Sequence, residues 1–61
     1  MQFNLEIDLE AASFEGEKGP AELARILRGL ANELNLMETL QPLERKILDI
    51  DTNYVGDANI A

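Results

Sequence analysis

The sequence has no cysteine and no histidine, and these two absences exclude the disulfide bonds and the usual structural metal sites that stabilise many very small domains. Without cysteine there is no disulfide framework, which also fits a reducing cytoplasm. Without either residue the usual ligands of a structural zinc ion are missing. A chain of 61 residues buries only about 60% of the surface that its unfolded state exposes, so its own core stabilises it weakly. Association with another subunit is the remaining route to stability.

Basic residues are also scarce, because five Lys and Arg stand against twelve Asp and Glu and leave a net charge of -7. This excess of acid disfavours direct binding to nucleic acid or to anionic membranes and favours a basic protein partner. The apolar runs are short and the first ten residues, MQFNLEIDLE, are acidic, so neither a spanning helix nor a secretory signal is predicted. We expect one cytoplasmic domain over residues 1–61.

Side chains for catalysis and metal binding are few. The chain has one serine, one tyrosine, two lysines and its carboxylates, and no nucleophile, base and orienting group converge in the sequence. A calcium loop is partly matched by Asp49, Asp51, Asn53 and Asp57, but Tyr54 replaces the required Gly and Ile60 the bidentate Glu. Asp and Asn are equally typical of tight turns. We expect no enzyme activity, no cofactor and no metal site.

The only long periodic segment runs from Gly19 to Asn35 and predicts an amphipathic helix. Pro20 suits a first helical turn, where its missing N–H needs no partner. Gly29 costs the helix about 1 kcal/mol relative to Ala, so either a neighbour approaches closely there or the site is solvated. The apolar positions recur at steps of three and four and form one stripe: Leu23, Ile26, Leu27, Leu30, Ala31 and Leu34.

Three segments predict strands. Apolar and polar residues alternate from Gln2 to Leu9, as in a half-buried strand. Residues 47–50 and 54–60 read as a hairpin around Asp51, Thr52 and Asn53, while residues 42–47 fit either a short helix or a strand. The order strand, helix, strand, strand predicts a small α+β domain with one helix packed on a three-stranded sheet.

Two features of the N-terminal part suggest a binding surface. Glu6, Asp8 and Glu10 recur at every second residue, so in a strand they stand about 7 Å apart on one face, like phosphates along a nucleic acid. The alternative is an ordinary solvated strand face. Phe14 lies within the predicted loop from Glu10 to Gly19 and either anchors the loop on the core or takes part in recognition. These four residues are the predicted protein-binding site.

Two further groups bear on self-association. Leu36, Met37 and Leu40 follow the helix and are too apolar for an ordinary loop, so either the core or another chain covers them. We predict that they form the interface of a homo-oligomer, most simply a dimer. Arg25 and Arg28 lie three residues apart and form either a solvated flank or a small anion site.

Four segments carry motifs: Ile7-Asp8, residues 11–14 (AASF), residues 21–31 (AELARILRGLA) and residues 48–56 (LDIDTNYVG). In their order and spacing, these motifs resemble those of a group of small uncharacterised proteins encoded by bacteriophages. The resemblance implies a phage origin and carries no activity. Those proteins have Asn-Ala-Ala-Phe at the first motif and Asp-Asn-Gly-Asn before Val-Gly at the last, whereas here Ser13 intrudes and Thr52 stands where they have Gly, which leaves the turn type open. The similar segments are spread over nearly the whole chain.

Taken together, these patterns lead to one main hypothesis about function. A small acidic phage accessory protein binds a host or phage macromolecule in the host cytoplasm and inhibits a nucleic-acid-handling or defence protein. One alternative is a structural module that only oligomerises. Another is a sponge for a nucleotide signal, bound at subunit interfaces near Arg25 and Arg28.

Overall fold

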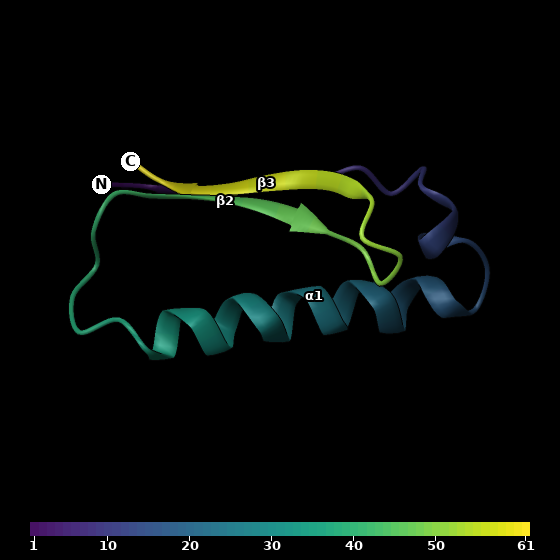
Figure 1. The fold of residues 1–61 in the computed structure, drawn as a ribbon, viewed down its shortest axis with the longest axis horizontal. Helices are drawn as coiled ribbons and strands as arrows, with labels where there is room; N and C mark the ends of the chain where they lie inside the picture. Colours follow the sequence, from purple (N-terminus) through teal and green to yellow (C-terminus); the bar gives the residue numbers. More distant parts are fainter.

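One long helix lies along one face of a three-stranded antiparallel sheet in the computed structural model, which describes residues 1–61 (Figure 1). The predicted fold class and element order are therefore confirmed. No helix combines the length and the apolar character needed to cross a membrane. The elements are β1 (Phe3–Ile7), the 3-10 helix η1 (Ala12–Phe14), α1 (Lys18–Asn35), β2 (Leu43–Leu48) and β3 (Tyr54–Ile60).

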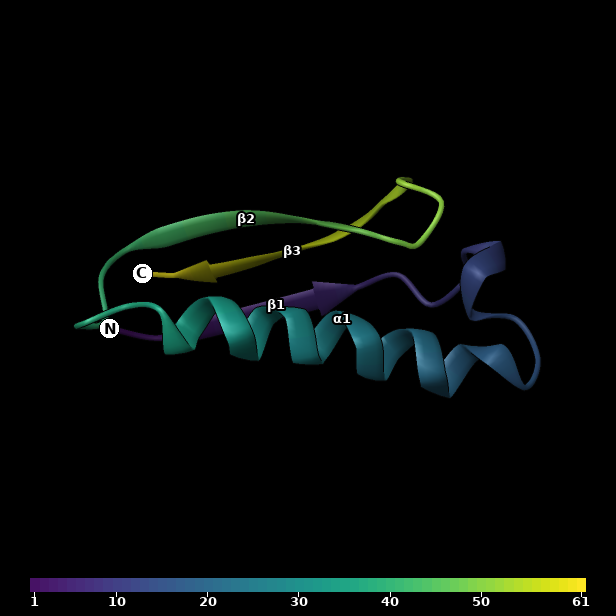
Figure 2. The same ribbon diagram turned by 60° about the horizontal axis from the view of Figure 1, so that its bottom comes forward.

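The C-terminal strand β3 is the centre of the sheet, in the order β1-β3-β2, so β1 and β2 are both edge strands. Gln2 and Ala61 exchange two backbone hydrogen bonds, of 2.6 and 2.9 Å, so the two ends of the chain lie together (Figure 1). In the turned view α1 runs along the length of the sheet (Figure 2). The face that meets α1 carries Phe3, Leu5 and Ile7 of β1, Leu43, Arg45 and Ile47 of β2, and Gly56, Ala58 and Ile60 of β3.

The first strand ends earlier than the alternation predicts. It stops at Ile7 rather than Leu9. Asp8 still donates its backbone N–H to Val55 at 2.7 Å, but its carboxylate accepts the backbone N–H of Glu10 at 2.9 Å and so turns the chain. The predicted ladder of three carboxylates is wrong in its last member, because Glu10 lies beyond the turn. Residues 42–47, predicted as either helix or strand, form a strand from Leu43. The predicted strand at residues 47–50 is wrong in its bounds, because β2 ends at Leu48 and Asp49 and Ile50 lie in the turn that follows.

A thin layer of side chains between α1 and the sheet forms the core. Phe14 anchors the loop on it, with only 9% of its surface exposed. Only nine of the 61 residues are buried and no large side chain is completely enclosed, so this core leaves much apolar surface outside. The buried apolar residues are Phe14, Ile26, Ile47, Val55, Ala58 and Ile60.

Two glycines allow backbones to approach more closely than a side chain permits. A Cβ at Gly56 in β3 would lie 2.0 Å from the backbone oxygen of Glu6 in β1. A Cβ at Gly19 would lie 2.2 Å from the backbone oxygen of Phe14, where η1 packs on the start of α1. Gly29, in contrast, has open space around it, so the solvated alternative holds there.

Candidate protein-binding surface

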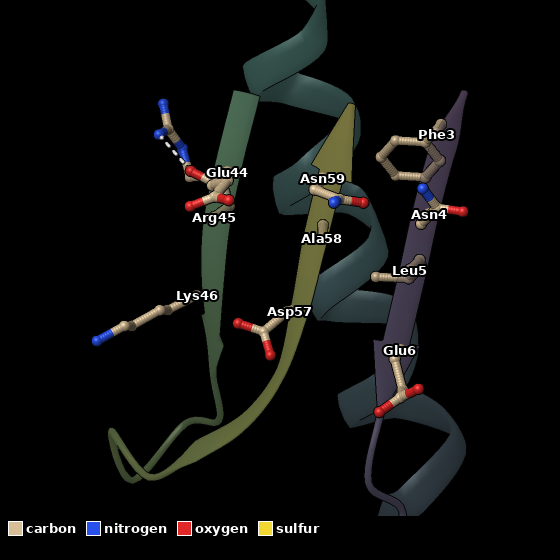
Figure 3. Close-up of a pocket in the computed structure, with 10 residues that line it drawn as sticks. All are labelled: Phe3, Asn4, Leu5, Glu6, Glu44, Arg45, Lys46, Asp57, Ala58 and Asn59. Carbon is tan, nitrogen blue, oxygen red and sulfur yellow. Dashed lines mark hydrogen bonds between the residues drawn. The ribbon is translucent and has the colours of Figure 1, made fainter. Parts of the chain in front are cut away.

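The face of the sheet that points away from α1 is open and polar (Figure 3). Alternation along each strand sends every second side chain to this outer face. It forms an open depression of about 840 Å³. The polar side chains of this outer face are Asn4 and Glu6 from β1, Asp57 and Asn59 from β3, and Glu44 and Lys46 from β2.

Two acidic residues lie opposite each other on neighbouring strands of the outer face. Glu6 and Asp57 are directly opposite in the β1–β3 register, so their Cβ atoms are about 5 Å apart. Like charges in this arrangement destabilise a sheet. The only two ion pairs of the protein are elsewhere, at Arg25–Glu22 and Arg45–Glu33. Neither Glu6 nor Asp57 therefore makes an ion pair within the chain.

Tyr54 and Lys46 border this pair. The Tyr54 hydroxyl donates a hydrogen bond to Asp57, which raises the pKa of the phenol. Lys46 is opposite Asp57 in the β2–β3 register, yet its ammonium lies 5.9 Å from the centroid of the Tyr54 ring and makes no ion pair. The outer face thus offers acceptors and one aromatic edge to a ligand that carries guanidinium or ammonium groups.

The remaining predicted site residues are distributed unevenly. Asp8 lies just past β1 and Glu10 beyond the turn, so neither faces Asp57. Phe14 belongs to the core, which supports the anchor interpretation and leaves no exposed ring for recognition. The apolar segment after α1, residues 36–40, leaves two of its side chains uncovered, since Leu36 is 86% and Leu40 65% exposed. Met37 between them is half-buried.

The basic spot on α1 is only partly free. Arg25 makes a bidentate ion pair with Glu22, at 2.7 Å from Nε and 3.0 Å from Nη2. The two N–H groups that Arg25 would offer to an anion are thus already bonded to Glu22, which argues against an anion site shared with Arg28.

A separate polar cluster joins α1 to the turn between β2 and β3. Glu22 of α1 is buried, accepts both Arg25 hydrogen bonds, and accepts the backbone N–H of Ile50 at 2.8 Å. The hydrogen bonds from Arg25 are the main reason that the pKa of Glu22 is lowered. Because Glu22 connects elements 28 residues apart, its role is to hold the hairpin on the helix.

Asp49 organises the same turn from inside. Its buried carboxylate accepts the backbone N–H groups of Asp51 and Asn53 at 2.9 and 2.8 Å. The Asn53 backbone bond is the main cause of a lowered Asp49 pKa; the Ser13 hydroxyl also lowers it, although that buried oxygen makes no hydrogen bond of normal geometry. Thr52 has φ 66, the left-handed conformation that favours Gly. Asp49 therefore caps the turn. The structure contains no group of three or more His, Cys, Asp or Glu residues that could hold a metal ion.

Acid is expected to weaken the fold through Glu22 and Asp49. Both pKa values lie lower in the folded chain than their ordinary values of 4.5 and 3.8. Their stabilisation is therefore complete above about pH 4.5 and is lost as the pH falls through the folded values. The melting temperature should be nearly constant from pH 7 to pH 5 and then drop steeply.

The substitution Glu22→Gln isolates part of this effect. It should lower the melting temperature at pH 7. It should also make the melting temperature less sensitive to acid, because only one of the two carboxylates whose protonation favours unfolding remains. Glu15→Gln is the control, because this residue is exposed and its backbone N–H, rather than its side chain, makes its hydrogen bond. Equal acid sensitivity of the parent and Glu22→Gln would contradict this assignment.

Several of these residues were outside the sequence prediction. Asp57, Tyr54 and Lys46 belong to the outer face only because of strand register, and Glu22 and Asp49 meet only because α1 packs on the hairpin. The alternation in β3 could have placed Asp57 with Asn59, but not opposite Glu6. No family model, curated protein or solved structure matches the chain, so similarity assigns it no activity or partner.

Proposed function

We propose that this protein is a small acidic accessory protein that binds a basic surface of another macromolecule through the outer face of its sheet. The observation that carries the proposal is the exposed Glu6–Asp57 pair, two like charges opposed across neighbouring strands without an ion-pair partner. Such a pair weakens the isolated fold. Features that cost stability without serving the fold are characteristic of functional sites.

A basic partner would reverse this cost. One guanidinium group can donate hydrogen bonds to two neighbouring carboxylates and neutralise their repulsion. The net charge of -7 would in addition speed the encounter with a positively charged surface at low salt. Binding of this kind needs no catalytic group, and the proposed role is not enzymatic.

The resemblance to phage proteins sets the proposed biological context. The partner would be a nucleic-acid-handling or defence protein in the host cytoplasm, whose basic groove normally holds phosphates and is occupied instead by carboxylates. The carboxylates come from three strands of a sheet, with Glu6, Glu44 and Asp57 on one face, rather than from one ladder along β1. A module that only oligomerises is the second candidate, favoured by the exposure of Leu36 and Leu40.

The test uses a charge change on the outer face and an equal change elsewhere. Tagged parent protein, a Glu6→Gln plus Asp57→Asn variant, and a Glu15→Gln plus Glu17→Gln control are used to capture proteins from host lysate at low and high salt. The captured partner is then purified and titrated with each protein by calorimetry. The outer-face variant should bind at least about tenfold more weakly, because charge-assisted hydrogen bonds contribute about 1.5 to 3 kcal/mol each.

Two further readouts separate binding from folding. The outer-face variant should keep or raise the melting temperature, because it removes a repulsion. Affinity of the parent should fall with added salt. Equal affinities of both variants, or no salt dependence, would exclude the outer face as the binding surface.

A further inference from the structure

The edge of β1 is unprotected. Gln2 pairs with Ala61 through two hydrogen bonds, and pairing alternates along an antiparallel ladder. The even-numbered residues of β1 therefore bond to β3. The backbone N–H and C=O groups of Phe3, Leu5 and Ile7 point away from the sheet, and no strand lies beside them (Figure 3).

The other edge differs. Strand β2 carries three consecutive charged residues, Glu44, Arg45 and Lys46, and follows Pro42. Charges and proline are the features with which proteins block pairing at an exposed edge. Strand β1 has no proline, no lysine and no bulge. Only the β1 edge is therefore suited to adding a strand.

The flank of α1 on the side of β1 is apolar as well. On the opposite flank Glu33 pairs with Arg45 of β2 at 2.8 Å, and Glu22 bonds to the turn after β2. A helix with 3.6 residues per turn directs its other flank away from β2, and Leu34 of that flank lines a small cavity together with Phe3 of β1. This flank consists of residues that are at least partly exposed: Ala24, Leu27, Ala31 and Leu34.

Together these groups make one apolar surface that the single chain leaves uncovered. Phe3 is 50%, Leu5 38% and Leu27 42% exposed. The chain measures 37 × 17 × 17 Å and exposes 4751 Å². A compact monomer of 6.8 kDa exposes about 3,950 Å². The excess of about 800 Å² is the area that one partner contributes to a stable interface.

We propose that a second copy of this chain covers this surface, with the two β1 strands paired antiparallel around a two-fold axis at Leu5. The two sheets become one six-stranded sheet, and the two α1 helices lie side by side beneath it. In this register Leu5 faces Leu5 of the second copy, and Phe3 faces Ile7 of the second copy. Alanines on the helix flank allow the helices to approach closely.

Charge selects this register over its neighbours. With the axis at Leu5, Asn4 is opposite Glu6 of the second copy, an amide against a carboxylate. With the axis at Glu6, the two Glu6 side chains would oppose each other, which destabilises a sheet. With the axis at Asn4, Ile7 would be opposite Met1 of the second copy, which lies outside β1. A slip by a single residue would put the helices on opposite faces.

The dimer also completes the outer face. Both Glu6–Asp57 pairs would lie on one continuous sheet, joined through β1, so a partner would meet four central carboxylates rather than two. This interface is distinct from the one predicted at Leu36, Met37 and Leu40, and the two can be separated by experiment.

Cysteine crosslinking tests the register, since the chain has no native cysteine. Under mild oxidation Leu5→Cys should form a disulfide-linked dimer almost completely, because paired Cα atoms are about 5.5 Å apart. Asn4→Cys and Glu6→Cys should crosslink at least about tenfold more slowly, because each then lies two positions from its own copy, about 8 Å away. Equal rates for all three variants would overturn the register.

Edge and flank variants test the interface itself by light scattering over a dilution series. Leu5→Pro removes only an outward N–H and should give a monomer with unchanged far-UV circular dichroism, whereas Asn4→Pro should unfold β1. Leu27→Glu should likewise give a monomer, and Leu36→Asp should remain a dimer. A parent that is monomeric at every concentration, or a dimer split by Leu36→Asp and not by Leu27→Glu, would overturn the proposal.

Discussion

Replacing Gly56 with alanine is expected to unfold this chain or to detach β1 from the sheet. The added Cβ would lie 2.0 Å from the Glu6 backbone oxygen and 2.9 Å from the Ile7 Cα. Because backbone atoms cannot rotate away as a side chain can, β1 must shift as a unit. Overpacking of this severity costs about 3 kcal/mol or more. A domain of this size has only about 3 to 9 kcal/mol in total, so thermal unfolding followed by circular dichroism should show most of its stability lost.

Gly29→Ala is the matched control, because it makes the same chemical change where nothing lies within 4 Å of the added carbon. In the interior of a helix this substitution should stabilise the protein by about 0.5 to 1 kcal/mol. Opposite effects at the two glycines would show that close strand contact, rather than glycine content, makes Gly56 necessary. A Gly56→Ala protein as stable as the parent would mean that β1 is not held at this distance.

Replacing Phe14 with alanine is expected to have the second large effect, a loss of about 3 to 5 kcal/mol. The ring is 9% exposed and packs in the core with Ile26, Ile47 and Val55. It also holds η1 against the start of α1, where Gly19 allows the contact. The variant should therefore be largely unfolded at room temperature, as measured by circular dichroism and urea titration.

The same variant distinguishes the two interpretations of Phe14. A recognition residue would lose partner binding at an unchanged melting temperature, which would contradict its place in the core. Leu36→Ala provides the comparison, because this side chain is largely exposed and its loss should change stability by no more than about 0.5 kcal/mol.

Local patterns were sufficient to predict most elements of this fold. The spacing of apolar residues placed a helix within one residue of the observed α1, and alternation placed β1. Turn residues placed the hairpin and its second strand, but its first strand was predicted at residues 47–50 and is observed at Leu43–Leu48. These elements follow from short-range geometry, since helical and extended chains put side chains on one face with fixed periods. The same patterns extended β1 to Leu9, because alternation alone cannot show that Asp8 turns back to bind the Glu10 N–H.

The sequence by itself therefore determined the long helix, the first strand, the hairpin, their order and the strong acidity, because these depend on local spacing and on composition. Only the tertiary structure decided which strand is central, and with it the opposition of Glu6 to Asp57. It also decided that Glu22 reaches the backbone of Ile50 and that the edge of β1 stays open. Strand order and register arise from pairing between distant segments, whose free energy depends on the whole assembled sheet rather than on any one segment.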